Sequence, residues 1–229
     1  MLSVDEWEAI RLSLKVASVA TLASLVPGIA VAFLLARSRF PGKFLLNALV
    51  HLPLVLPPVV TGYMLLLSFG RRAPLGQLLD ACCGLVLSFR WTGAALASAV
   101  MAFPLLVRAV RLSFEGVDAR LESAAGTLGA SPAWVFATVT LPLSAPGIVA
   151  GALLCFAKAL GEFGATITFV SNIPGETRTL ASAIYTYTQV PGGDAAALRL
   201  TLVAVVIAVG ALAGSEALAA SVQHRVANR

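Results

Sequence analysis

Long apolar stretches separated by short polar connections dominate this sequence of 229 residues. A helix needs about 20 predominantly apolar residues to cross the hydrocarbon core of a bilayer. Five segments meet or approach that length, near residues 12–36, 44–69, 88–110, 142–167 and 198–220. Apolar residues make up 59% of the chain and charged residues only 12%, against about half and about a quarter in soluble domains. The sequence therefore predicts an all-α integral membrane protein, embedded in a lipid bilayer as a single domain over residues 1–229.

Prolines and glycines interrupt several of these segments. Pro27 and Gly28 predict a kink in the first one. The second segment is long enough to be one span, although three prolines crowd its first half, at positions 53, 57 and 58. Glycines at positions 161 and 164 flank Glu162 and predict a break or bend in the fourth.

The connection over residues 115–142 is different, because its pattern predicts two helices joined by a turn. Asp118 is a good N-cap for the first helix. Gly129 suits the positive φ at which such a helix ends, and Ser131-Pro132 suits the start of the second helix. Leu141-Pro142 predicts a break that leads the chain into the fourth span.

The first helix of this pair carries a narrow apolar stripe of small side chains, which lets another surface approach closely. Its members recur at helical spacing: Leu121, Ala124, Ala125 and Leu128. Arg120, Glu122 and Thr127 are expected to project elsewhere. An amphipathic connector lying on the bilayer is the alternative, but such helices usually pair Lys or Arg with large apolar residues. We therefore interpret the stripe as a docking surface.

The spacing of residues in this connection resembles the EAA loop of ABC importer permeases. The matching positions are Glu122, Ala124, Ala125, Gly129, Leu141 and Pro142, and Ser123 and Val139 are mild departures from the family pattern. Longer motifs beginning at Phe40, His51 and Gly161 resemble the molybdate-type permease subunit of bacterial ABC importers. The resemblance implies a type I ABC importer permease fold with a cytoplasmic coupling helix between the third and fourth spans.

The resemblance also implies a function and partners. The chain would carry molybdate across the bacterial inner (plasma) membrane as a homodimer. Two ATP-binding subunits would dock on the coupling loop, where the six matching residues would act, and an extracytoplasmic binding protein would deliver the anion. Sulfate, thiosulfate and tungstate remain alternative cargoes.

The orientation in the membrane follows from that coupling loop rather than from the count of positive charges. With the N-terminus outside, eight of the sixteen Lys and Arg residues fall on the inner side and eight on the outer side. The count of positive charges therefore does not decide between the two orientations. The cluster Arg37, Arg39 and Lys43 between the first two spans favours this orientation. A cytoplasmic loop before the fourth span places the N-terminus outside and the C-terminus in the cytoplasm.

The sequence lacks the motifs of an ATPase. Its only Gly-Lys pair is Gly42-Lys43, and Arg37 stands where the first glycine of a Walker A motif is required. We therefore expect no catalytic activity and no cofactor in this chain, with ATP and Mg²⁺ bound by the partner ATPase. No metal-ligand spacing and no basic run interleaved with aromatic residues occurs, so neither a metal site nor nucleic-acid binding is expected.

Polar residues within the spans are candidates for the pathway of an oxyanion. Lys158 and Glu162 share one helical face, as an ion pair or as part of a gate. Hydrogen-bond donors that could hold an anion weakly are Thr61, Thr166, Thr168, Ser171 and Asn172. Helix capping and packing are the alternative roles for these five residues. A remote alternative is a membrane-embedded enzyme using Glu162 and His51, although no nucleophile or metal set accompanies them; His51 otherwise suits a packed polar residue.

Small residues are expected to pack helices closely. Two pairs have the spacing of a small-xxx-small face, Gly147 with Gly151 and Gly210 with Gly214. We expect both within one subunit, with a homodimer contact as the alternative. The three cysteines, Cys82, Cys83 and Cys155, are interpreted as small apolar fillers.

Overall fold

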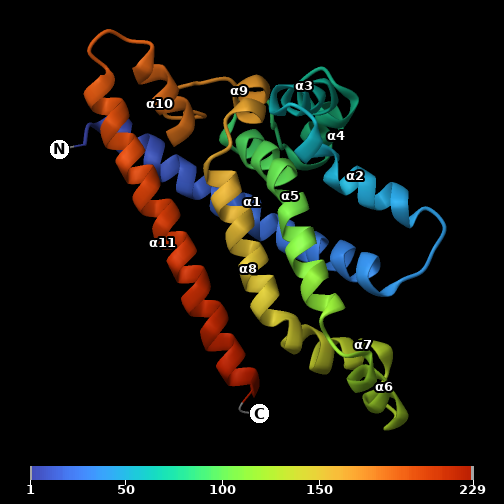
Figure 1. Ribbon diagram of the computed structural model, residues 1–229. Coiled ribbons are helices and arrows are strands. Elements are labelled where there is room, and N and C mark those ends of the chain that lie inside the picture. The colour runs from blue at the N-terminus through green and yellow to red at the C-terminus, as the bar shows by residue number, and fades with distance from the viewer. Residues whose placement is uncertain (1, 228–229) are drawn as a thin grey trace.

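The computed structural model describes residues 2–227, with side chains described as far as Gly214. This part of the chain is all-helical (Figure 1). Four stretches are long and apolar enough to span a bilayer. They are α1 (Val4–Arg37), α5 (Trp91–Glu115), the run from α7 (Pro132–Val135) through the π-helix η1 (Phe136–Thr140) to α8 (Leu141–Leu160), and α11 (Asp194–Ala227).

Helices α1, α5 and α8 form the centre of the subunit, and α11 lies beside α8 along one edge (Figure 1). Their shared core includes Leu35, Leu106, Phe114 and Cys155, all of which are fully buried. The helix α1 continues through Pro27 without interruption. The glycine pair on α8 allows α5 to approach closely, because a Cβ at Gly147 would clash with the Ser113 side chain of α5.

The second predicted span, residues 44–69, is not one helix. It consists of α2 (Lys43–Val55) and α3 (Pro58–Phe69), which meet at an angle of 113°. Leu56 has φ −71° and ψ 144°, and Pro57 has φ −56° and ψ 134°. Consecutive prolines favour this break, because a proline disfavours the α conformation in the residue before it, and both Leu56 and Pro57 precede a proline. The predicted second span is therefore a bent pair of helices, which together are long and apolar enough to cross a bilayer.

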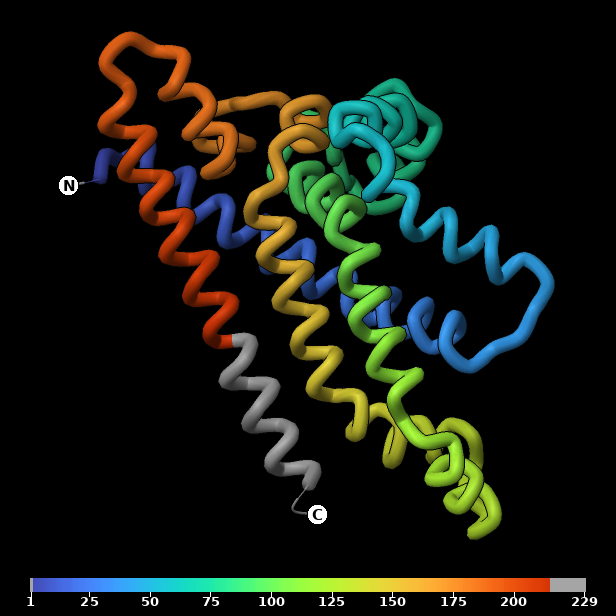
Figure 2. Tube along the Cα trace, viewed as in Figure 1, coloured from blue at the N-terminus to red at the C-terminus, as the bar shows by residue number. Residues whose placement is uncertain are grey.

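Short helices gather at one end of the molecule. They are α3, α4 (Pro74–Cys83), α9 (Gly164–Val170) and α10 (Leu180–Thr188) (Figure 2). The opposite end carries α6 (Ala119–Thr127) and α7 (Figure 1). The fourth span ends at Leu160, short of the expected residue 167, and the predicted break beside Glu162 is confirmed.

The two glycine pairs have different surroundings. Gly147 and Gly151 face α5 within the subunit, as predicted. A Cβ at Gly210 or Gly214 would meet no described residue within 4 Å, so the part of the subunit that the structure describes does not show the predicted packing for this second pair. The cysteines also differ in their surroundings. Cys155 is buried in the core, as a small apolar filler would be, whereas Cys82 and Cys83 are exposed on α4.

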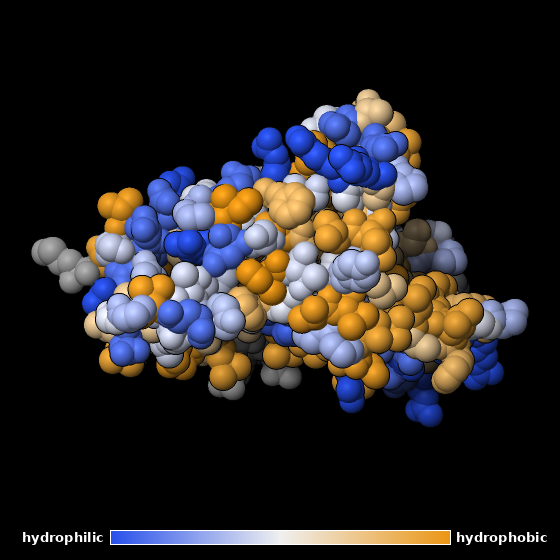
Figure 3. All heavy atoms as spheres, turned by 90° about the horizontal axis from the view of Figure 1, so that it is seen from above, coloured by the Kyte–Doolittle hydropathy of each residue, from blue (hydrophilic) through white to orange (hydrophobic). Residues whose placement is uncertain are grey.

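Much of the apolar surface is exposed, as lipid-facing helices require. Hydrophobic side chains form a broad area in the right-hand part of the molecule in Figure 3, with hydrophilic ones at its upper and lower edges. On α2, Phe44 is 84% exposed and Val55 is 81% exposed. The outer surface of α2 is thus suited to contact with lipid or with another subunit.

Candidate functional site

The helical pair α6–α7, here called the hairpin, begins and turns as its sequence predicts. The Asp118 carboxylate accepts a hydrogen bond from the Arg120 backbone N–H at 2.9 Å. Ser131 Oγ accepts one from the Trp134 N–H at 3.3 Å, which caps α7. Gly129 has φ +88°, the left-handed conformation that glycine adopts without a Cβ clash. The predicted caps and turn are therefore confirmed.

The hairpin does not end in a helix break at Leu141-Pro142. The chain instead passes through the π-helix η1, in which the Leu141 N–H donates to the Phe136 carbonyl oxygen five residues earlier. This wider turn lies directly before Pro142, which lacks an N–H and whose ring crowds the carbonyl four residues back in a regular α-helix. The prediction of a break was wrong, because the widened turn accommodates the proline and connects the hairpin to α8 as one continuous helical run.

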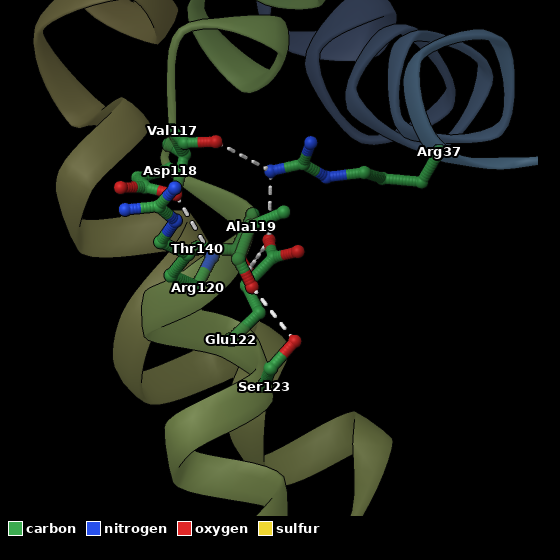
Figure 4. Close-up of polar contacts among 8 residues, drawn as sticks. All are labelled: Arg37, Val117, Asp118, Ala119, Arg120, Glu122, Ser123 and Thr140. Carbon is green, nitrogen blue, oxygen red and sulfur yellow. Dashed lines mark hydrogen bonds and ion pairs between the residues drawn. The ribbon is translucent and has the colours of Figure 1, made fainter.

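Glu122 points into the molecule rather than away from it (Figure 4). Its Oε1 lies 3.0 Å from Arg37 Nη2, at the last turn of α1, and accepts a hydrogen bond from Thr140 Oγ1 at 2.7 Å. Arg37 Nη2 also donates to the Val117 carbonyl oxygen at 3.1 Å. These contacts join α1, the α5–α6 connection, α6 and η1. Glu122 therefore projects away from the small-residue stripe, as expected, and it points toward α1 and η1.

Aromatic packing reinforces the same junction. The Phe33 ring on α1 lies 4.8 Å from the Phe136 ring of η1 and 5.6 Å from the Phe114 ring of α5, centroid to centroid. Edge-to-face pairs at such distances contribute about 0.5–1.5 kcal/mol beyond the burial of their area. A cavity of about 460 Å³ remains beside Glu122, between α1 and the hairpin. The hairpin is thus attached to the spans by one polar and one aromatic cluster.

The opposite face of the hairpin is free within the described subunit. Leu121 is 50% exposed, Leu128 89% and Trp134 63%. Ala124 is exposed and Ala125 half-buried, so the small-residue stripe is accessible along most of α6. The hairpin therefore combines an anchored polar face with an exposed apolar face.

Glu162 occupies the break between α8 and α9. Its side chain is 1% exposed, and its Oε2 lies 2.7 Å from Lys158 Nζ, so the predicted ion pair is confirmed. Its Oε1 accepts a hydrogen bond from the Ala165 N–H at 3.0 Å, at the start of α9. The carboxylate therefore holds the two helices in a fixed relation.

The candidate pathway donors differ in what their side chains contact. Thr166 Oγ1 and Thr168 Oγ1 donate to the Phe163 and Gly164 carbonyl oxygens, at 2.9 Å each. Asn172 Nδ2 donates to Thr186 Oγ1 at 2.7 Å. Ser171 is exposed and has φ +65°. Thr61 is buried, and its hydroxyl has no hydrogen-bond partner among the described residues. It lines a cavity of about 230 Å³ at the bend between α2 and α3, here called the elbow.

His51 lies in a different environment from Glu162. Its Nδ1 is 2.8 Å from the Asn47 carbonyl oxygen, and it lines a cavity with Arg108 and Arg111. No polar contact between His51 and Glu162 occurs in the described part of the chain, so the acid–base pair of the enzyme alternative is not assembled. Within residues 2–214 there is also no group of three or more His, Cys, Asp or Glu side chains arranged to hold a metal.

Sequence reasoning missed the partners of Glu122. Arg37 was interpreted only as a charge at a membrane end, and Thr140 was not singled out. The sequence separation of 85 residues between Arg37 and Glu122 leaves no local pattern that joins them.

Three comparisons with known proteins bear on this arrangement. The family model described as binding-protein-dependent transport system inner membrane component matches residues 28–224. The molybdenum transport system permease protein ModB of Escherichia coli (strain K12) is 58% identical over 219 residues, covering 96% of each chain. The corresponding ModB of Haemophilus influenzae is 53% identical over 221 residues, again covering 96% of each.

A solved structure supports the fold. A chain of the MetNI methionine ABC transporter in an inward facing conformation matches with a TM-score of 0.75, covering 97% of this chain and 99% of that one. Its sequence identity of 17% shows a shared architecture alone. With the family match over most of the chain and these relatives along nearly its whole length, this chain belongs to the family of binding-protein-dependent transport system inner membrane components and is a multi-pass permease subunit with the ABC importer fold.

Proposed function

We propose that this chain translocates molybdate across the bacterial inner membrane. The observation that carries the proposal is the 58% identity to the Escherichia coli molybdenum permease over 96% of both chains. Sulfate, thiosulfate and tungstate are dianions of similar shape, and they are the competing cargoes that the test below distinguishes.

ATP hydrolysis in a separate subunit would drive transport, with ATP and Mg²⁺ bound there. The exposed side chains Leu121, Leu128 and Trp134 form an apolar surface suited to a groove on that subunit. Glu122, Ala124, Ala125, Gly129, Leu141 and Pro142 are the proposed coupling residues. Because Glu122 bonds Arg37 and Thr140, a displacement of the hairpin would be transmitted to α1 and α8.

The orientation and assembly follow from a cytoplasmic hairpin. Arg37, at the last turn of α1, contacts the hairpin, so the first turn of α1 and the N-terminus would lie outside. Helix α11 runs toward the hairpin end of the molecule (Figure 1), so a cytoplasmic hairpin would place the C-terminus in the cytoplasm. Two copies would enclose the pathway between them, and an extracytoplasmic binding protein would deliver the anion to the end that carries α9 and α10.

The pathway would pass near the α2–α3 elbow and the α8–α9 break. Thr61 offers a buried hydroxyl without a partner among the described residues. Glu162 and Lys158 would form part of a gate there. The walls of the pathway beside this gate would include Thr166, Thr168, Ser171 and Asn172. Hydrogen bonds to neighbouring groups of the subunit fix three of these side chains, those of Thr166, Thr168 and Asn172.

Reconstitution tests the proposal. The permease, co-purified with its ATPase subunits, is placed in proteoliposomes containing ATP, and uptake is measured with the binding protein outside. Molybdate should stimulate both ATP hydrolysis and uptake, at lower concentrations than sulfate, thiosulfate or tungstate. Stimulation by sulfate or thiosulfate in preference to molybdate would assign the other cargo, and uptake without added binding protein would contradict the proposed partnership.

A further inference from the structure

The cavity between α2 and α5 has a composition unlike the apolar cavities of the other spans. It measures about 310 Å³ and is lined by Asn47, His51, Arg108, Arg111, Leu112 and Glu115. A water molecule takes about 30 Å³ of liquid volume, so the space accommodates a small anion together with several waters. Five of the six lining side chains are polar.

The charges of this cavity favour an anion. Arg111 Nε donates to Glu115 Oε1 at 2.7 Å, so the only carboxylate among the lining residues is already paired. Arg108 lies one turn earlier on α5, is exposed, and makes no ion pair within the described part of the chain. Two guanidinium groups thus face one carboxylate, which leaves a net positive charge.

The hydrogen bonds also leave donors available. Arg111 Nη1 donates to Asn47 Oδ1 at 3.1 Å, which holds the guanidinium plane across the gap between the two helices. The backbone carbonyl oxygen of Asn47 can only accept a hydrogen bond. The 2.8 Å contact between it and His51 Nδ1 therefore requires the proton to be on Nδ1. The remaining Arg111 N–H groups, the Arg108 guanidinium and Asn47 Nδ2 make no hydrogen bond to any residue that the structure describes, and they are available as donors. Guanidinium forks recognise phosphate-like oxyanions through paired N–H···O bonds.

We propose that this cavity binds a tetrahedral oxyanion. Two sources share that chemistry. One is the phosphate of an anionic lipid, since basic pockets between helices near the inner membrane surface hold such headgroups. The other is the transported anion itself as it leaves the pathway toward the cytoplasm, an assignment that rests on the proposed function. The cavity suits both, because Arg108 and Arg111 lie in the last two turns of α5, close to the hairpin.

Arg108→Gln, Arg108→Lys and Leu112→Trp test the site in the complex with its ATPase subunits. Arg108→Gln removes charge without breaking an ion pair of the described structure. Arg108→Lys keeps the charge. Leu112→Trp fills the cavity without changing charge, because Leu112 lines it and is 61% exposed. Arg71→Gln is the matched control, an exposed arginine on the connection between α3 and α4.

Two readouts distinguish the sources. Equilibrium binding of radiolabelled molybdate in neutral detergent, without binding protein, reports the free anion, and native mass spectrometry with added phosphatidylglycerol or phosphatidylcholine reports the lipid. We expect one ligand, molybdate or phosphatidylglycerol, to bind the wild type, and Arg108→Gln to weaken it about tenfold or more, as loss of a charged hydrogen bond implies. Leu112→Trp should also weaken it. Arg108→Lys should weaken it less than Arg108→Gln does, because it keeps the charge but loses the paired N–H groups, and Arg71→Gln should bind as the wild type does.

The outcomes separate this inference from the proposed function. Equal binding by wild type, Arg108→Gln and Leu112→Trp overturns the site, and so does a wild type that binds neither ligand. In both cases molybdate uptake in proteoliposomes stands as an independent measurement. A complex that retains phosphatidylglycerol through Arg108 but transports no molybdate supports the site while it contradicts the proposed function.

Discussion

Arg37 Nη2 at the last turn of α1 lies 3.0 Å from Glu122 Oε1 on α6, although 85 residues separate the two in sequence. The two side chains are only 23% and 21% exposed. The pair therefore ties the first membrane helix to the surface on which we propose that an ATPase docks. The Glu122 carboxylate thus anchors the inner face of the hairpin and is not on its exposed face. This arrangement leads to specific tests.

The first prediction concerns this pair. Glu122→Gln should reduce ATP-coupled molybdate uptake while the permease still assembles in the membrane, because the hairpin loses one anchor and keeps its helices. The loss of stability should be small, about 1 kcal/mol for a partly exposed pair. Uptake and thermal unfolding are measured on the same preparations, with Asp80→Asn on the exposed surface of α4 as the control.

A double-mutant cycle with Arg37→Met makes the test of the pair quantitative. If the two residues act together, the double variant should lose little more uptake than either single variant. Additive losses would show that Glu122 acts through a contact other than Arg37, such as one with the ATPase.

The second prediction concerns the exposed face of the hairpin. Leu128 is 89% exposed at the end of α6, so Leu128→Glu should leave the unfolding midpoint of the permease unchanged. Burying a leucine in an interface contributes about 1.5–3 kcal/mol, so affinity for the ATPase subunits should fall about tenfold or more. Co-purification and titration of the ATPase measure this. Leu78→Glu, at a leucine 57% exposed on α4, is the control, and equal losses from both variants would contradict a docking role.

The third prediction concerns the contact between α3 and α9. A Cβ at Gly62 would lie 2.5 Å from the Ala165 carbonyl oxygen and 2.9 Å from its Cα, and backbone atoms cannot rotate away. Gly62→Ala should therefore destabilise the permease by about 1–3 kcal/mol, as overpacking does. Thermal unfolding in detergent measures it. Gly210 lies in α11 with no described residue within 4 Å of an added Cβ, so Gly210→Ala should not lower the midpoint. Matching midpoints for the two variants would refute the packing argument.

Short-range features of this chain were predictable, and long-range ones were not. Asp118, Gly129 and Ser131 perform the capping and turning that their own chemistry favours, and Lys158 with Glu162 meets at the spacing of one helical turn. These relations depend on residues within a few positions of each other.

The pairing of Arg37 with Glu122 depends instead on how α1 crosses the end of α5, which no local pattern encodes. The bend at Pro57 was partly predictable from the sequence. Adjacent prolines indicate where a helix is prone to stop, but they do not give the angle of 113°, beyond which α3 packs against α9. The spacing of Gly210 and Gly214 was recognised, but the expected neighbouring helix was not found, since no described residue lies against either glycine.

The fourth prediction concerns Lys158 and Glu162, and it depends on their unequal burial. The Glu162 side chain is 1% exposed and that of Lys158 is 32% exposed. Lys158→Met would leave a buried carboxylate without its counterion, whereas Glu162→Gln removes the charge and keeps an oxygen to accept the Ala165 N–H. Breaking a fully buried pair costs about 3–5 kcal/mol, and the partial exposure of Lys158 lowers that figure.

Lys158→Met should therefore destabilise the permease more than Glu162→Gln does, and the double variant should be more stable than Lys158→Met alone. Thermal unfolding of the three variants measures this order. The reverse order would mean that the charge on Glu162 is needed for reasons other than its pairing with Lys158. If Glu162→Gln retains the stability of the wild type and still loses uptake, the carboxylate acts in the transport cycle itself, as the proposed gate requires, because the loss would then come from a charge that the folded state does not need.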